Sequence, residues 1–257
     1  LGFAGGANRG IARTDAPIVV VLNPDVNVDP GFGAALVQLF AGNPRLGVAG
    51  PKLRYPNGGL IQHAGGVVNY PLLTTAHRGY REPDDGRWDQ PLAVDFVTGG
   101  AMALRRAALD AVGLFDEGFY PAYYEDVDLC FRLRQAGWEV RYEPSLTATH
   151  FESVTLGRSL DYYRLFHRNR LRFALKHLSR TAWWTQFLPA ETQRLRGELS
   201  AVSDVDWPVT SGAAALESLV RARGFTRAAR DAGLLDGEPL LSAVQAIDEL
   251  RERRMLT

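Results

Sequence analysis

Three acidic residues stand close together near the middle of the sequence, at Glu125, Asp126 and Asp128. Carboxylates this near to one another raise each other's pKa unless a cation or a helix N-terminus stabilises them. The aromatic run over 119–124 comes directly before them, and aromatic faces and tyrosine hydroxyls suit the binding of sugar rings. The cluster therefore indicates a carbohydrate site. The plainer alternative is that the acids cap the start of a helix.

A second group of oxygen-bearing side chains follows the β-branched run 18–22. Asn23 and Asp25 stand two residues apart there, and an oxygen pair with this spacing on an extended segment can hold a hard cation such as Mg²⁺ or Mn²⁺. In open α/β sheets ligands bind beyond the carboxyl ends of strands, so the position suits a ligand site. An ordinary turn is the alternative, because Asn, Pro and Asp are turn residues.

One histidine and two glycine-rich segments complete the candidates. His150 follows a predicted strand, and its neutral imidazole could complete a metal site begun by Asp25, although a lone histidine is more often an ordinary surface or core residue. The opening over 2–10 is a weak phosphate-loop pattern, because it is not G-x-G-x-x-G and no strand precedes it. Gly99 and Gly100 indicate either a close backbone approach to a ligand or a simple bend.

The elements that must position these residues alternate between strands and helices up to about residue 150. The run 18–22 reads as a strand buried on both faces, as in a parallel sheet, and Asp29 as the N-cap of a helix that begins at Pro30. Further predicted elements are strands at 46–50, 94–97, 101–104 and 138–142, loops and short hairpins over 51–92, a loop over 143–149, and helices at 30–41, 106–112 and 125–136. A basic amphipathic helix follows at 160–178, and later helices are predicted at 190–201, 212–223 and 239–254.

Composition places the chain among ordinary globular proteins. It has 257 residues, a net charge of +0 and 46% hydrophobic residues, and this balance argues against a nucleic-acid partner. Cys130 is the single cysteine, so no internal disulfide can form and a reducing compartment is expected. No apolar run is long enough for a membrane span. The sequence starts at Leu1, inside what reads as a loop, which we interpret as a fragment boundary.

Taken in order, these motifs resemble glycosyltransferase family 2 in its rhamnosyltransferase-like branch. The similarity runs from Leu1 to about Ser153 and rests on the blocks GFAGGANRG, VVVLNPDV, FVTGGAMALRR, GLFDEGFYPAYYEDVDLCFRLRQAGWEV and TH. The resemblance implies an α/β fold of the GT-A type, with a catalytic domain over 1–158 and a helical region over 159–257. The strand-loop-helix with which this family opens does not precede Leu1, so the nucleotide-binding sheet is expected to be incomplete at its N-terminus.

The resemblance also implies a role for each candidate residue. Asp126 matches the acid that serves as general base, with Glu125 beside it. Asp25 and His150 match ligands of a divalent metal, Mg²⁺ or Mn²⁺, and Asn23 stands where the plainest form of the motif has Asp. The implied donor-binding residues are Asn23, Asp25, Gly5, Gly6, Asn8, Thr98, Gly99 and Gly100, and the implied acceptor-binding residues are Tyr123 and Tyr124.

The implied function is inverting transfer of a sugar from a nucleotide-sugar donor, such as dTDP-rhamnose, to a hydroxyl of a glycan or lipid-linked glycan in cell-wall polysaccharide synthesis. The protein would be cytoplasmic. Two other hypotheses stay open: a non-catalytic fragment that keeps the fold and binds a glycan or a partner, and a metal-dependent hydrolase with the same carboxylates. No pattern in the sequence predicts an oligomeric state.

Aromatic residues after the basic helix leave a further choice open. Trp183, Trp184 and Phe187 together with that helix suit a peripheral contact with the inner face of the membrane. Packing of these residues on the catalytic domain is the alternative and the one that we favour.

Overall fold

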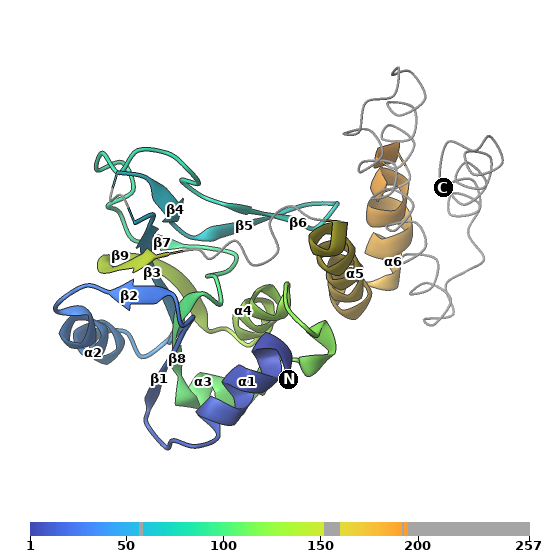
Figure 1. Ribbon diagram of the computed structural model, residues 1–257. Helices are drawn as coiled ribbons and strands as arrows, with labels where there is room; N and C mark the ends of the chain where they lie inside the picture. Colours follow the sequence, from blue (N-terminus) through green and yellow to red (C-terminus); the bar gives the residue numbers. More distant parts are fainter. Residues whose placement is uncertain (57–58, 152–159, 192, 195–257) are drawn as a thin grey trace. The chain divides into compact units, whose positions relative to one another are not determined.

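The computed structural model describes residues 1–56, 59–151, 160–191 and 193–194, and the chain divides into two compact units (Figure 1). The first unit holds Leu1–Asn69 and Thr75–Val154, and the second holds Tyr70–Thr74 together with the chain from Thr155 onward. The sequence did not predict that the short segment Tyr70–Thr74 belongs with the helices of the second unit. The predicted boundary after residue 158 falls within 152–159, outside the described residues.

A seven-stranded mixed sheet forms the centre of the first unit, in the order β1-β8-β3-β9-β2 with β4 beside β3 and β7 beside β9. The strands are β1 Ile18–Leu22, β2 Val26–Val28, β3 Leu46–Arg54, β4 Ile61–His63, β7 Leu92–Ala93, β8 Ala101–Arg105 and β9 Glu139–His150. β3 and β9 run parallel, whereas β1, β2, β4 and β7 each pair antiparallel with their neighbour. A separate two-stranded sheet pairs β5 Gly66–Asn69 with β6 Thr74–His77.

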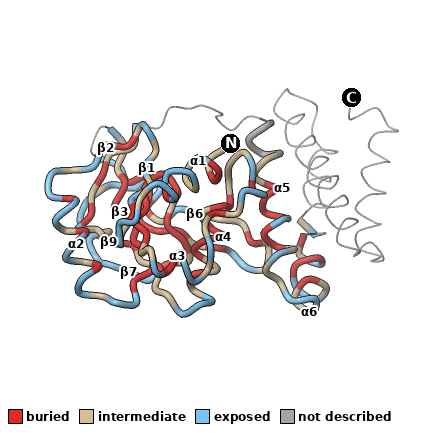
Figure 2. The backbone as a smooth tube through the Cα atoms, turned by 90° about the horizontal axis from the view of Figure 1, so that it is seen from below, coloured by how far each residue is buried: buried red, intermediate tan, exposed pale blue. Residues whose placement is uncertain are grey.

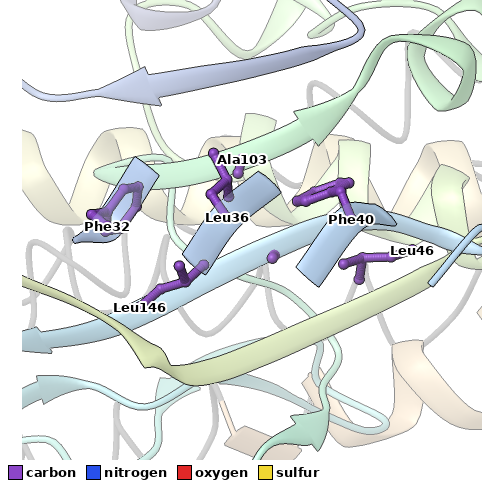
Figure 3. Close-up of a cluster of buried hydrophobic side chains, with 7 residues drawn as sticks. Phe32, Leu36, Phe40, Leu46, Ala103 and Leu146 are labelled. Atoms are coloured by element: carbon purple, nitrogen blue, oxygen red, sulfur yellow. The ribbon is translucent and has the colours of Figure 1, made fainter. Parts of the chain in front are cut away.

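Helices cover both faces of this sheet. α2 (Phe32–Gly42) packs its apolar side on the sheet in one buried cluster, which Figure 3 shows and which comprises Phe32, Leu36, Phe40, Leu46, Ala49, Ala103 and Leu146. Gly47 lies next to α3 (Arg106–Val112), because a Cβ there would meet Ala108 and Trp138. β3, covered on both sides, is buried along nearly its whole length (Figure 2).

The α/β class and most predicted elements are confirmed, and three strand predictions need correction. β1 is not a parallel strand buried on both faces: it pairs antiparallel with β8 alone among the described strands, and Val20 and Leu22 are exposed. A β-branched run cannot tell a central strand from one at the edge. The predicted strand 94–97 contributes only a bridge from Phe96 to Gly66, and the predicted loop over 143–149 continues β9 as far as His150.

The start of α2 also differs from the prediction. The helix begins at Phe32 after Gly31, which has a left-handed φ of 87° and takes the N-cap position predicted for Asp29. The Asp29 carboxylate instead pairs with Arg54 and accepts a hydrogen bond of 2.6 Å from the Thr147 hydroxyl. Asp29 therefore ties the start of the helix to β3 and β9 through its side chain.

The glycine-rich opening is a helix and not the predicted loop. α1 spans Gly2–Ile11 and buries Ala4, Gly5 and Ile11. Packing overrides the low helix propensity of its glycines. The Phe3 N–H donates to the Pro121 carbonyl at 2.8 Å, and the Phe3 ring meets Phe115 edge-on at 5.6 Å.

The second unit contains α5 Leu160–His177, α6 Arg180–Ala182 and a π-helical turn at Trp183–Phe187. Its buried polar centre is Arg170, which donates to the Leu72 carbonyl and pairs with the buried carboxylate of Glu191. The Trp183 and Phe187 rings stack at 5.1 Å and are buried. Packing of these residues on the catalytic domain stays a prediction.

Three predicted helices extend beyond the described residues. The helices predicted over 212–223 and 239–254, and most of the one over 190–201, lie outside the described residues. Within the described residues, no helix combines the length and the apolar character that a membrane span requires.

Candidate active site

The loop Thr98–Gly100, the central loop of the site, contacts both candidate clusters, which lie far apart in the sequence. On one side, the Asn23 N–H donates to the Gly100 carbonyl at 2.9 Å. On the other side, the Gly99 N–H donates to Asp126 Oδ2 at 2.8 Å. Gly99 and Gly100 therefore fix the end of β1 and the start of α4 (Glu125–Gln135) relative to each other.

Asp25 and His150 meet directly, as predicted. β2 pairs with the end of β9, so that Val26 lies opposite His150, and the Phe151 N–H donates to the Asp25 carbonyl at 2.8 Å. This pairing brings His150 Nε2 to 3.1 Å from Asp25 Oδ1. The other ring nitrogen, Nδ1, lies 2.7 Å from Gln62 Oε1. Gln62 was not predicted as a site residue.

The donor set of this pair fits a divalent cation. Because the Gln62 oxygen accepts a proton from Nδ1, a neutral His150 presents a bare Nε2 to the Asp25 carboxylate, and two acceptors facing each other call for a proton or a cation between them. Their separation of 3.1 Å matches neighbouring ligands of an octahedral ion with bonds of about 2.1 Å. Among the described residues no third His, Cys, Asp or Glu joins the group.

Asp126 has the surroundings of a carboxylate base. It stands in the first turn of α4, and its two oxygens accept from the Gly99 and Val127 N–H groups, each at 2.8 Å. Burial raises the pKa of Asp126, while these hydrogen bonds act in the opposite direction. A buried carboxylate whose pKa is raised takes up a proton more readily than an exposed one.

Glu125 is held differently from its neighbour. Its side chain is 5% exposed, and within the described structure its Oε2 has no hydrogen-bond partner. Burial, followed by the negative charge of Asp126, raises the pKa of Glu125 to about 9. Glu125 is therefore a neutral acid at pH 7, and the single negative charge of the pair rests on Asp126, which has the backbone donors.

The third carboxylate of the cluster has a structural role. Asp128 is fully buried and accepts from Arg132 Nε at 2.8 Å, which confirms the pair predicted four residues apart on the helix. Arg132 also donates to the carbonyls of Val112 and Leu114 at 2.7 Å each. This pair fixes α4 against the end of α3 and leaves Asp126 as the acid of the cluster that faces the loop.

The remaining predicted donor residues of the glycine-rich opening lie on α1. Asn8 donates to the Phe115 carbonyl at 2.9 Å and accepts from the Phe115 N–H at 3.0 Å, so its amide is engaged by the protein. Gly5 is buried. α1 instead supports the central loop, because Phe3 packs directly on Gly99. The donor-binding role of Gly5, Gly6 and Asn8 stays a prediction.

Gly99→Ala is expected to destabilise the loop, since its Cβ would lie 2.8 Å from the Phe3 ring. Overpacking of this kind costs about 1–3 kcal/mol. Thermal unfolding should show that loss, and Phe3→Leu combined with Gly99→Ala should restore part of it. Equal stability of Gly99→Ala and the wild type would mean that α1 does not brace the loop.

The two predicted acceptor residues differ in exposure. Tyr124 is 2% exposed and stands at the N-cap of α4, so it offers almost no surface to a sugar. Tyr123 is half-buried, and burial raises the pKa of its hydroxyl. Both have a left-handed φ, 79° and 73°, which is uncommon outside glycine and often marks functional sites. Tyr123 alone of the two can offer a ring to an acceptor.

Comparison with curated proteins finds glycosyltransferases that are similar to this chain. The curated relatives include an N-acetylglucosaminyl-diphospho-decaprenol L-rhamnosyltransferase of Mycobacterium tuberculosis, 32% identical over 72% of this chain and 66% of the relative. A pre-mycofactocin glycosyltransferase of the same species is 28% identical over 70% of this chain and 37% of the relative. The chain thus spans less than two thirds of the length of these relatives.

A solved structure and a family model complete the comparison. The structure of GalNAc-T7 with UDP, GalNAc and Mn²⁺ aligns with a TM-score of 0.47 and 16% identity, over 64% of this chain and 35% of that one. The model of the glycosyltransferase like family 2 matches residues 2–181, which include the central loop and every predicted site residue. The chain therefore belongs to glycosyltransferase family 2, as its motifs predicted.

Proposed function

We propose that this site transfers a sugar from a nucleotide-sugar donor to a hydroxyl group of a glycan acceptor, with inversion at the anomeric carbon. The observation that carries the proposal is the central loop, whose residues Gly99 and Gly100 bind Asp126 on one side and the Asn23 backbone on the other. An in-line displacement needs a base on the acceptor side and stabilisation of negative charge on the leaving side. The loop fixes the base, Asp126, and the strand end that carries the residues of the leaving side relative to each other.

Asp126 is the proposed general base. As the acceptor oxygen attacks the anomeric carbon, its proton passes to an Asp126 oxygen, a new C–O bond forms, and the bond to the diphosphate oxygen breaks with its electron pair on the leaving group. The Gly99 and Val127 N–H groups hold the carboxylate in place before the transfer. Neutral Glu125 adds no second negative charge that would hinder approach of the anionic donor.

Asp25 and His150 are the proposed ligands of a divalent metal, Mg²⁺ or Mn²⁺. Such an ion, when bound, neutralises the charge that develops on the departing diphosphate. The Asp25 carboxylate and the imidazole of His150 set the position of the diphosphate, and Asn23 holds the strand end to the loop through its backbone N–H.

The names of the relatives guide the choice of substrates. A rhamnosyl donor such as dTDP-rhamnose and a lipid-linked glycan acceptor are the first to test, because one relative is named as an L-rhamnosyltransferase that acts on a diphospho-decaprenol-linked sugar. A lipid-linked acceptor would place the protein at the inner face of the membrane, in agreement with the basic character of α5.

Asp25→Ala is expected to abolish metal-dependent nucleotide binding, since it removes the only carboxylate that faces His150 among the described residues. Calorimetry with dTDP and UDP, with and without Mn²⁺, should show binding to the wild type that Mn²⁺ strengthens. Asp15→Ala, which removes an exposed carboxylate from the same unit, should bind like the wild type. Unchanged binding by Asp25→Ala would overturn this assignment.

A further inference from the structure

We infer that Gln62 and His63, adjacent residues of β4, are positioning residues that hold the two halves of the site, Gln62 acting on His150 and His63 acting on the loop that binds Asp126. The inference rests on the proposed function for its catalytic meaning. Neither residue was identified as a candidate from the sequence. Both side chains are almost completely buried, with exposed fractions of 5% for Gln62 and 1% for His63.

The backbone of β4 has the irregularity that such a double role requires. β4 pairs antiparallel with β3, with Leu53 opposite His63 and Arg54 opposite Ile61, so Gln62 is an extra residue in the ladder. A bulge of this kind bends the strand and re-aims side chains, and bulges are frequent next to active sites. Here the bulge gives two consecutive buried polar residues a partner each within the site.

Gln62 fixes the protonation pattern of His150. Its Oε1 lies 2.7 Å from His150 Nδ1, and an amide oxygen can only accept, so the proton of a neutral imidazole sits on Nδ1. The bare Nε2 then faces Asp25 at 3.1 Å, which is the form that a metal ligand needs. Partners of this kind fix the tautomer and the ring orientation of metal-binding histidines.

His63 anchors the loop in the same manner. Its Nε2 lies 3.4 Å from the Thr98 N–H, which can only donate, so His63 carries its proton on Nδ1 and donates it to His77 Nδ1 at 2.8 Å. Burial, aided by His77 and Arg78, lowers the pKa of His63 well below its usual range, in agreement with a neutral ring. The ring also lies against Phe96.

Every N–H group of the loop then has an assigned acceptor. Thr98 donates to His63 and Gly99 donates to Asp126, while the Gly100 N–H donates to the Thr98 hydroxyl at 3.3 Å. Releasing the Thr98 N–H from His63 would let the loop turn and would move the Gly99 donor away from the base. A displacement of about 1 Å in a catalytic group can cost about 100-fold in rate.

Two pairs of variants separate the two roles. Gln62→Met keeps the length of the side chain but removes the acceptor, and Gln62→Glu restores one. His63→Phe keeps an aromatic ring but removes the acceptor nitrogen, and His63→Gln restores an acceptor. Each protein would be measured for the ¹⁵N shifts of the histidine rings, the amide ¹H shifts of Thr98 and Gly99, Mn²⁺ and nucleotide binding, and the kcat of sugar transfer.

The two pairs should give opposite patterns. Gln62→Met should change the His150 ring shifts and weaken Mn²⁺-dependent nucleotide binding by about 10- to 100-fold. His63→Phe should leave that binding unchanged, shift the Thr98 amide proton and lower kcat by about 10- to 100-fold. Gln62→Glu and His63→Gln should recover most of each loss. The inference would be overturned if Gln62→Met and His63→Phe lost nucleotide binding and kcat to the same extent. It would also be overturned if neither the His150 ring shifts nor the Thr98 amide shift changed.

The wild type alone also decides the matter if a variant fails to fold. Its ring ¹⁵N shifts should show both His150 and His63 protonated on Nδ1, and the opposite tautomer in either would overturn the corresponding role. A wild type with these tautomers that forms no glycoside from any donor would overturn the proposed function and leave the positioning geometry intact.

Discussion

Asp126→Asn is expected to lower the kcat of sugar transfer by about 1,000-fold, within the range that general bases contribute. The single amide oxygen of asparagine can still accept from the Gly99 or the Val127 N–H group, and its NH2 group cannot accept from the other, so nucleotide binding is the control for the geometry of the loop and the start of α4. What the amide cannot do is take the proton of the acceptor hydroxyl. Nucleotide binding measured by calorimetry should therefore stay at the wild-type value while steady-state turnover falls.

The pH dependence of turnover gives a second readout of the same residue. Because burial raises the pKa of Asp126, kcat/KM should fall as the pH decreases through that raised pKa, and Asp126→Asn should lack this limb. Asp110→Asn, which removes an exposed carboxylate from α3, serves as the matched control and should behave like the wild type. Turnover of Asp126→Asn within threefold of the wild type would place the base elsewhere.

Glu125→Gln is expected to stabilise the protein at alkaline pH. The folded protein holds a proton on Glu125 up to about pH 9, whereas the unfolded chain releases it near 4.5. Between these values the folded state binds more protons, so the stability of the wild type falls as the pH rises, by about 1.4 kcal/mol per pH unit from this group. A neutral amide of the same size removes that contribution.

Denaturant unfolding at pH 5, 7 and 8.5 measures the difference. The stability of Glu125→Gln relative to the wild type should increase steadily with pH, and other titrating groups cancel in this comparison. Glu82→Gln, at an exposed carboxylate, should run parallel to the wild type at all three values. A constant difference between Glu125→Gln and the wild type would show that Glu125 is ionised in the folded protein.

The sequence predicted the residues of this site that stand at the ends of regular elements. Asn23 and Asp25 follow a β-branched strand, and Asp126 opens a helix with strong end signals, so local pattern placed each of them correctly. His150 was expected beyond a loop, yet it ends β9 itself. The reason is that polar residues within β9, such as Glu143 and Thr147, read as a loop in the sequence although the strand continues through them.

Residues held by tertiary contacts could not be found in this way. Gln62 and His63 lie on a strand of three residues with a bulge, within a segment rich in Gly, Pro and Asp, where no periodicity marks an element. The helix α1 was missed because its glycines lower helix propensity. At Gly2 the glycine permits a close approach, because a Cβ there would lie 2.6 Å from the Pro121 carbonyl oxygen.

The most direct test of sugar transfer by this site is to follow one reaction by NMR, with dTDP-rhamnose as donor, Mn²⁺ present and a diphospholipid-linked N-acetylglucosamine as acceptor. The account predicts a glycoside product whose anomeric configuration is opposite to that of the donor, formed by the wild type and not by Asp126→Asn. A product with retained configuration, or release of free sugar and nucleotide without a glycoside, would contradict it.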